Sequence, residues 1–100
     1  MKIKMQQSLY NIKGIELKDE KKEVLKLKDI LINTTLTDVD KEEDKLANFK
    51  LGMKLNKADK EVDLTAEEIT ALQKKIKKVY STLIVGQVHE ILEGHENPIL

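Results

Sequence analysis

The sequence contains no cysteine, no tryptophan and no arginine, and each of these absences excludes a kind of chemistry. Without cysteine the chain can form neither disulfides nor thiolate metal sites. All 18 basic residues are lysine, so the chain lacks the planar guanidinium group that binds phosphates and guanine edges through paired hydrogen bonds. The 18 acidic residues cancel the positive charge. Nucleic acid is therefore not the partner that we expect.

Long apolar runs are also missing. No segment approaches the length of about 20 apolar residues that crosses a bilayer. The opening segment, MKIKMQQSLY, lacks the apolar core of a signal peptide. We therefore expect an intracellular, cytoplasmic protein without a membrane partner.

Aromatic side chains are scarce, because Phe49, Tyr10 and Tyr80 are the only ones present. The core must therefore be built mainly from Leu and Ile. At 100 residues the chain buries only about two thirds of the surface that its unfolded form exposes, which suits one core and not two. A single small domain without a sizeable enclosed active site is expected.

The spacing of apolar residues changes near residue 28. Before it, extended runs at about residues 15–17 and 24–27 flank a polar loop, and Gly14 marks a turn. From about 28 to 93 the spacing is helical, and residues 94–100 form a tail. We predict a mainly α domain with three to four short helices and a small N-terminal β-hairpin, which must pack on the helices to persist.

Capping residues predict where the helices begin. A first short helix is expected over residues 30–36. The second should begin at Asp40, with Glu43 three residues later, and end near Ala58. The third should begin at Thr65, where Glu68 completes a capping box.

A fourth helix is predicted from a shift in the apolar phase after Tyr80. A break near Ser81-Thr82 restores the phase, and the new helix should run to about Glu93. Gly94 is then suited to the left-handed position that follows a helix.

The second helix carries two apolar stripes on nearly opposite sides. Leu46, Phe49 and Met53 form one stripe, and Ala47, Leu51, Leu55 and Ala58 form the other. Both stripes could be covered within the domain, or one could meet another chain. Because Phe49 has the larger area, we assign its stripe to the core. The predicted partner-binding residues are three from the other stripe and two from the broad apolar arc of the fourth helix: Ala47, Leu51, Leu55, Ile84 and Val88.

The segment HEILEGH, residues 89–95, invites comparison with the zinc-peptidase motif His-Glu-x-x-His. That motif needs its second His four residues after the first, but Glu93 occupies this position and His95 lies beyond Gly94. An adventitious metal held by His89, Glu93 and His95 is the alternative to an ordinary exposed His–Glu pair. We predict no metal site, and we expect His89→Ala to leave the fold and the activity largely intact.

Other catalytic and cofactor motifs are missing as well. Asp38-Val39-Asp40 begins like a calcium loop, but Glu43 and Phe49 stand where that loop needs glycine and a bidentate acid. No serine lies in a nucleophile elbow, and the four glycines form no phosphate-binding loop. We therefore expect neither an enzyme nor a cofactor.

Several segments resemble a group of small proteins encoded in tailed phages and prophages. They are Glu61–Ile69 (EVDLTAEEI), Val79-Tyr80, Leu83–Val88 (LIVGQV), the Lys13-Gly14 turn and Leu25–Leu31 (LKLKDIL). The likeness covers most of the chain and rests on structural motifs. Family members carry a proline at the junction where this chain has Ser81-Thr82. The resemblance implies a phage setting and supplies no catalytic residues.

These observations favour a protein that binds another protein, either a phage assembly component or a host protein such as a defence enzyme. A homodimer is a further possibility, because a two-fold axis lets one patch form both halves of an interface. The alternative is a nucleic-acid-associated accessory protein that uses the lysine face of the third helix, Lys74, Lys77 and Lys78.

Overall fold

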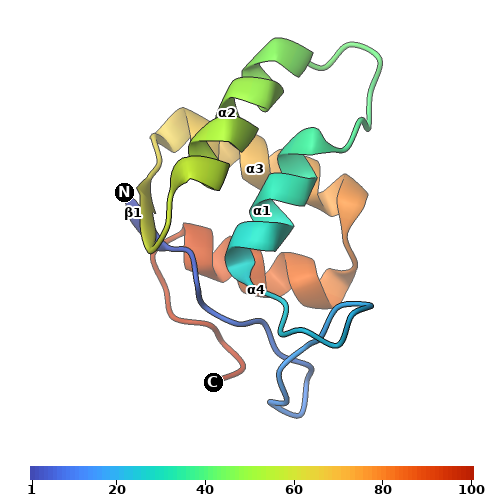
Figure 1. Ribbon diagram of the computed structural model, residues 1–100, viewed down its shortest axis with the longest axis vertical. Coiled ribbons are helices and arrows are strands. Elements are labelled where there is room, and N and C mark those ends of the chain that lie inside the picture. Colours follow the sequence, from blue (N-terminus) through green and yellow to red (C-terminus); the bar gives the residue numbers. More distant parts are fainter.

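A computed structural model describes residues 1–100 as four helices and a two-stranded sheet (Figure 1). The helices are α1 (Leu27–Leu36), α2 (Lys45–Lys57), α3 (Ala66–Val79) and α4 (Thr82–Leu92), and the strands are β1 (Lys2–Lys4) and β2 (Glu61–Asp63). The predicted mainly α fold is confirmed. The first helix begins three residues earlier than expected and ends as predicted.

The two named strands come from distant parts of the chain. β1 pairs antiparallel with β2, and Ile3 stands opposite Val62. Both of these side chains point into the core, whereas their neighbours along each strand are exposed. Single strands of three residues have too short a pattern to reveal such a pairing from sequence.

The N-terminal hairpin is present in a small form. Lys18 and Val24 make an isolated antiparallel bridge. The Asp19 amide donates to the Glu23 carbonyl at 2.8 Å, and the Leu25 amide donates to the Leu17 carbonyl at 2.9 Å. At the preceding turn Gly14 has a φ of +83°, a conformation that favours glycine.

Two of the predicted helix boundaries are confirmed by their hydrogen bonds and backbone angles. The Glu68 amide donates to the Thr65 hydroxyl at 3.1 Å, and the Thr65 amide donates to the Glu68 carboxylate at 2.9 Å, which completes the capping box. The helix breaks at Ser81, and α4 ends before Gly94, whose φ is +91°. The apolar phase shift was therefore a reliable signal.

The predicted start of α2 at Asp40 is wrong, because the N-cap of the helix lies four residues later. Asp44 is its N-cap and accepts a hydrogen bond from the Ala47 amide at 2.9 Å. The Glu43 carboxylate does accept from the Asp40 amide, as a capping box requires, but residues 41–43 form a turn instead of the first helical turn. Glu43 is held both by amides of this turn and by side chains of α2 and α3.

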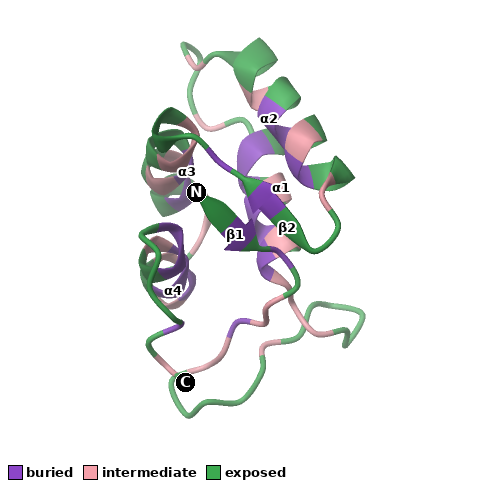
Figure 2. Ribbon diagram, turned by 90° about the vertical axis from the view of Figure 1, so that its left-hand side faces the viewer, coloured by how far each residue is buried: buried purple, intermediate pink, exposed green.

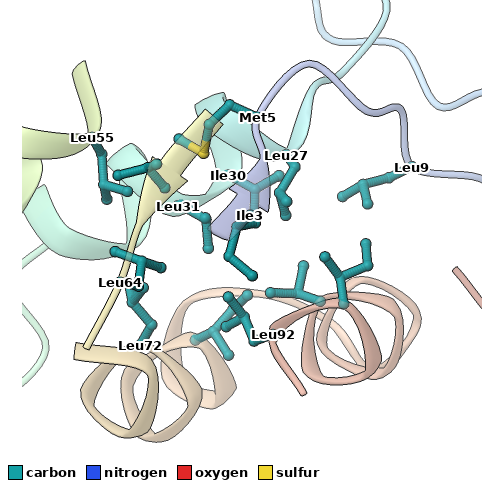
Figure 3. Close-up of a cluster of buried hydrophobic side chains, with 14 of the residues drawn as sticks. Ile3, Met5, Leu9, Leu27, Ile30, Leu31, Leu55, Leu64, Leu72 and Leu92 are labelled. Atoms are coloured by element: carbon teal, nitrogen blue, oxygen red, sulfur yellow. The ribbon is translucent and has the colours of Figure 1, made fainter. Parts of the chain in front are cut away.

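The core is aliphatic, as the composition predicts, and it lies where the sheet and all four helices meet. Figure 3 shows side chains from β1, α1, α2, α3 and α4 converging on one cluster. Each fully buried Leu or Ile contributes about 1.5–3 kcal/mol relative to exposure. Figure 2 shows that the buried residues lie on the inner sides of the helices. The largest members of the cluster include Met5, Leu9, Leu27, Ile30, Leu31, Leu55, Leu64, Leu72, Ile76 and Leu92.

Candidate binding surface

One face of α2 leaves three large apolar side chains uncovered. Leu46 is 64% exposed, Phe49 is 56% exposed and Met53 is 41% exposed. Their spacing of three and then four residues aligns them along the helix. In Figure 2 exposed residues follow the outer side of α2, at the edge of the molecule. We call these three residues the α2 stripe.

The opposite face of α2 belongs to the core. Leu55 is fully buried and Leu51 nearly so. The two predicted stripes therefore exist, but their roles are the reverse of those that we assigned. Placing Phe49 in the core was wrong, because α2 packs on α1 through its Leu51 side and nothing in the chain reaches the other side.

The other predicted partner-binding residues fall mostly in the interior. Ile84 and Val88 are buried in the core, and with Leu51 and Leu55 they do not lie on an exposed surface. Ala47 is exposed on α2. From the broad apolar arc of α4 we predicted an exposed apolar surface on this helix. The sequence pattern could not show that other segments of the chain cover it.

Close packing against α1 extends the apolar surface beyond α2. Gly52 lies so near α1 that a methyl group built on it would come within 2.9 Å of the Thr35 hydroxyl and 3.0 Å of a Leu36 methyl group. Leu36, at the end of α1, is itself exposed. It therefore borders α2 and adds apolar area next to it.

Some of the charged residues around the α2 stripe form ion pairs within the chain, and others do not. Lys45 pairs with Asp38 at 3.6 Å, and Lys54 pairs with Glu68 at 2.7 Å. Burial raises the pKa of Glu68, but hydrogen bonds from Lys54 and the Thr65 amide outweigh it, and the pKa lies below its usual value. Lys50 and Lys57 on α2, and Glu42 in the turn before it, form no ion pair within the chain. Their charges are available to a partner.

The turn that leads into α2 is held by Glu43. This carboxylate accepts hydrogen bonds from the Val39 amide at 2.7 Å, the Asp40 amide at 2.9 Å and the Asn48 side chain at 2.6 Å, and it pairs with Lys75 at 2.7 Å. Both charged side chains of this ion pair are only 11% exposed. Hydrogen bonds from the Asp40 amide and from Lys75 lower the pKa of Glu43 from 4.5 to about 2.

Lys75 also ties α3 to α1, because it donates to the Thr35 carbonyl at 3.0 Å. Nothing in the local sequence distinguishes this lysine from its neighbours. Only its position on the helix indicates that Lys75 is partly buried, because it lies one residue before the buried Ile76 and hence beside the apolar face of α3. The ion pair fixes the N-terminal end of the candidate surface.

An open groove of about 500 Å³ lies between this turn and the lysine face of α3. Lys78 pairs with Asp40 across it, and Lys75 with Glu43, so the acidic turn neutralises two of the four lysines. Lys74 and Lys77 remain unpaired. The groove is lined by Val39, Asp40, Glu43, Asn48, Ala71, Lys74, Lys75, Lys77 and Lys78.

The residues of HEILEGH point to separate partners. His89 Nε2 lies 3.1 Å from the Gln73 carbonyl on α3, whereas His95 Nδ1 lies 2.7 Å from the Glu90 carboxylate. Glu93 accepts a long hydrogen bond of 3.4 Å from the Gln73 side chain. No three His, Asp or Glu side chains of the chain are grouped as metal ligands.

A buried polar pair that the sequence did not reveal fixes the ends of the chain on α4. The Gln87 side chain accepts from the Tyr10 amide and donates to the Tyr10 carbonyl, both at 2.8 Å. Buried Asn97, in the tail, donates to Gln87 at 2.9 Å. Its position on the apolar face of α4 was the one feature of the sequence that could have indicated that Gln87 is buried.

Comparisons with family models, curated proteins and solved structures gave no match. None of the four helices has the length and apolar character that crossing a membrane requires.

Proposed function

We propose that this chain is a non-catalytic binding protein that docks on a partner protein through the α2 stripe. The observation that carries the proposal is the exposure of Leu46, Phe49 and Met53 on one face of a helix whose other face is anchored in the core. Helices that insert into an apolar groove use anchors at this spacing of i, i+3 and i+7. A large aromatic residue at the centre is typical of the residues that dominate binding energy.

The proposed setting is a phage or prophage, with the protein acting in the host cytoplasm. Its support is the resemblance of the cap, helix junction and hairpin segments to small phage proteins. The partner is then a phage assembly component or a host protein, such as a defence enzyme. The rigid anchoring of α2 by Gly52, Leu55 and the Glu43 network favours this function, because a preorganised helix loses little freedom on binding.

The test is affinity capture from infected and uninfected host lysates. The wild type is compared with Leu46→Ser/Phe49→Ser and with a control that removes another exposed apolar pair, Ile12→Ser/Ile15→Ser. The proposal expects a specific protein that the wild type and the control retain and the α2 variant loses. Equal capture by all three proteins, with their circular dichroism unchanged, would show that α2 is not the docking surface.

The groove beside α3 supports a second candidate, a nucleic-acid-associated accessory function. Its support is the pair of unpaired lysines, Lys74 and Lys77, within a cluster of four. Binding through phosphates weakens steeply with salt because condensed counterions are released. Retention on DNA that falls with salt and is lost in Lys74→Glu/Lys77→Glu would favour this candidate over the first.

A further inference from the structure

Residues 94–100, which we call the strap, are fastened to the rest of the chain mainly by one side chain. Asn97 is the only buried residue of the strap, and the residues on either side of it are exposed. Its Nδ2 donates to Gln87 Oε1 on α4 at 2.9 Å. No other hydrogen bond joins residues 96–100 to the other parts of the chain.

The base of the strap is suited to bending. Gly94 has a φ of +91°, so the chain turns away from α4 at a residue that adopts this conformation without strain. His95 Nδ1 lies 2.7 Å from the Glu90 carboxylate, but both side chains are about half exposed, and exposed pairs contribute little. Beyond this base, Asn97 provides the polar hold on the strap.

The Asn97 bond can break without leaving Gln87 unpaired. Gln87 Oε1 also accepts from the Tyr10 amide at 2.8 Å. Gln87 Nε2 donates to the Tyr10 carbonyl at 2.8 Å and to the Leu83 carbonyl at 3.0 Å. A buried polar group is costly only when it loses its last partner. Removing the strap therefore leaves these three bonds intact, and the Asn97 amide exchanges its bond for water.

The N-terminal segment on the other side of Gln87 is held more firmly. Leu9, next to Tyr10, is fully buried in the core. The Leu9 amide donates to the Leu25 carbonyl, and the Leu9 carbonyl accepts from the Leu17 amide. This segment would lose core packing and backbone bonds if it moved. Of the two segments that Gln87 binds, the strap is the one that separates at lower cost.

We infer that the strap lifts from α4 as a unit while the rest of the domain stays folded, with Gly94 as hinge and the bond from Asn97 to Gln87 as latch. Segments with few buried contacts open at a lower free energy than the whole fold. Ile91, only 4% exposed, lines the same hollow as Asn97, so lifting the strap uncovers it. This inference concerns α4 and does not depend on the proposed docking role of α2.

The test is thiol labelling of single-cysteine variants over a series of low urea concentrations, because the chain has no cysteine of its own. Ile91→Cys reports on the strap. Ile76→Cys, a matched substitution at a fully buried site on α3, reports on global unfolding. Labelling of Ile91→Cys should not depend on urea, whereas labelling of Ile76→Cys should accelerate with it, because global unfolding exposes far more surface.

Two further substitutions separate lifting from global unfolding. Asn97→Ala should raise the labelling rate of Ile91→Cys about fivefold, the effect of one hydrogen bond. Leu55→Ala, in the core on α2, should accelerate labelling of Ile76→Cys on the order of thirtyfold and leave that of Ile91→Cys unchanged, because the lifted state keeps the same core defect. Glu96→Ala, at an exposed strap residue without an ion pair, is the control for Asn97→Ala and should have no effect.

The inference is overturned if Ile91→Cys and Ile76→Cys share one urea dependence, if Leu55→Ala accelerates both equally, or if Asn97→Ala leaves the labelling of Ile91→Cys unchanged. Should Ile91→Cys not fold, amide hydrogen exchange of the unmodified chain answers the same question. The Ile99 amide, which donates to Asn97 within the strap, should exchange without dependence on urea, in contrast to the amide of Leu72 on α3. Equal protection of these two amides would also overturn the inference.

Discussion

Helices α2 and α4 both carry more apolar surface than one neighbouring helix covers, yet the chain covers only that of α4. Ile84, Val88, Ile91 and Leu92 are all buried, because the N-terminal segment and the tail lie against α4 (Figure 1) and Gln87 binds both of them. No segment crosses the outer side of α2. An apolar excess in a sequence therefore indicates an interface only where the chain has no irregular segment left to lie on it.

The largest expected effect is a difference in unfolding free energy between the buried residues of the two helices and the exposed stripe of α2. Leu55→Ala on α2 and Ile84→Ala on α4 should each cost about 2–5 kcal/mol, because each empties a packed site. Phe49→Ala should change stability by only about 0.5 kcal/mol, since surface substitutions rarely cost more. Urea unfolding at low protein concentration measures the three values.

A large loss for Phe49→Ala under these conditions would contradict the contrast. It would mean that the stripe is covered within the monomer and that α2 and α4 do not differ. The comparison depends on working below the concentration at which any dimer forms, because association stabilises the folded chain by mass action.

The next effect tests what covers α4. Gln87→Leu places an apolar side chain of similar size in the site but leaves the Tyr10 backbone and the Asn97 side chain without partners. We expect a loss of about 2–3 kcal/mol, since each buried unpaired polar group costs about 1–3 kcal/mol and a loosened tail lets water reach part of the site. Thermal unfolding measures the loss, and faster hydrogen exchange at the Tyr10 amide would locate it. Unchanged exchange would mean that the N-terminal segment is held on α4 by other contacts.

The contrast between these helices also explains how much could be predicted from the sequence. Periodicity and capping residues predicted three to four helices, a break near Ser81-Thr82 and the start of α3, because these features depend on neighbours within one or two turns. The role of Phe49 and the burial of Ile84 depend on segments far away in the chain. The apolar pattern on α2 identified two stripes correctly but could not show which one α1 would cover.

The prediction of where α2 begins was wrong for a similar reason. Asp40 and Glu43 have the spacing of a capping box, and half of its hydrogen bonds do form. Glu43 also pairs with Lys75, which comes from α3, and the cap of α2 is Asp44 instead. A local pattern cannot reveal a partner that lies 32 residues away.

The pH dependence of stability tests this anchor of α2. A carboxyl whose pKa is lowered on folding favours the folded state above its unfolded pKa, near 4.5 for Glu43, and the contribution is lost as the pH falls towards about 2. Glu43→Gln should therefore be less stable than the wild type near neutral pH, and the difference should shrink through this window. Urea unfolding at several pH values measures it. A difference that stays constant with pH would show that the carboxylate charge does not hold the turn.

The smallest expected effect compares the N-terminal ends of α3 and α4. Thr65 accepts a hydrogen bond from the Glu68 amide, whereas Ser81, in the same position before α4, makes no side-chain cap bond. Thr65→Ala should therefore cost about 1 kcal/mol, and Ser81→Ala should cost clearly less, since only the first removes an acceptor from an unpaired amide. Thermal unfolding of the two variants beside the wild type measures the difference. Equal losses would mean that Ser81 caps α4 in solution and that the two helix ends are alike. If neither variant loses stability, water replaces the Thr65 hydroxyl at no cost, and the start of α3 is then fixed by packing of the buried Leu64 and Leu72 on either side of the cap.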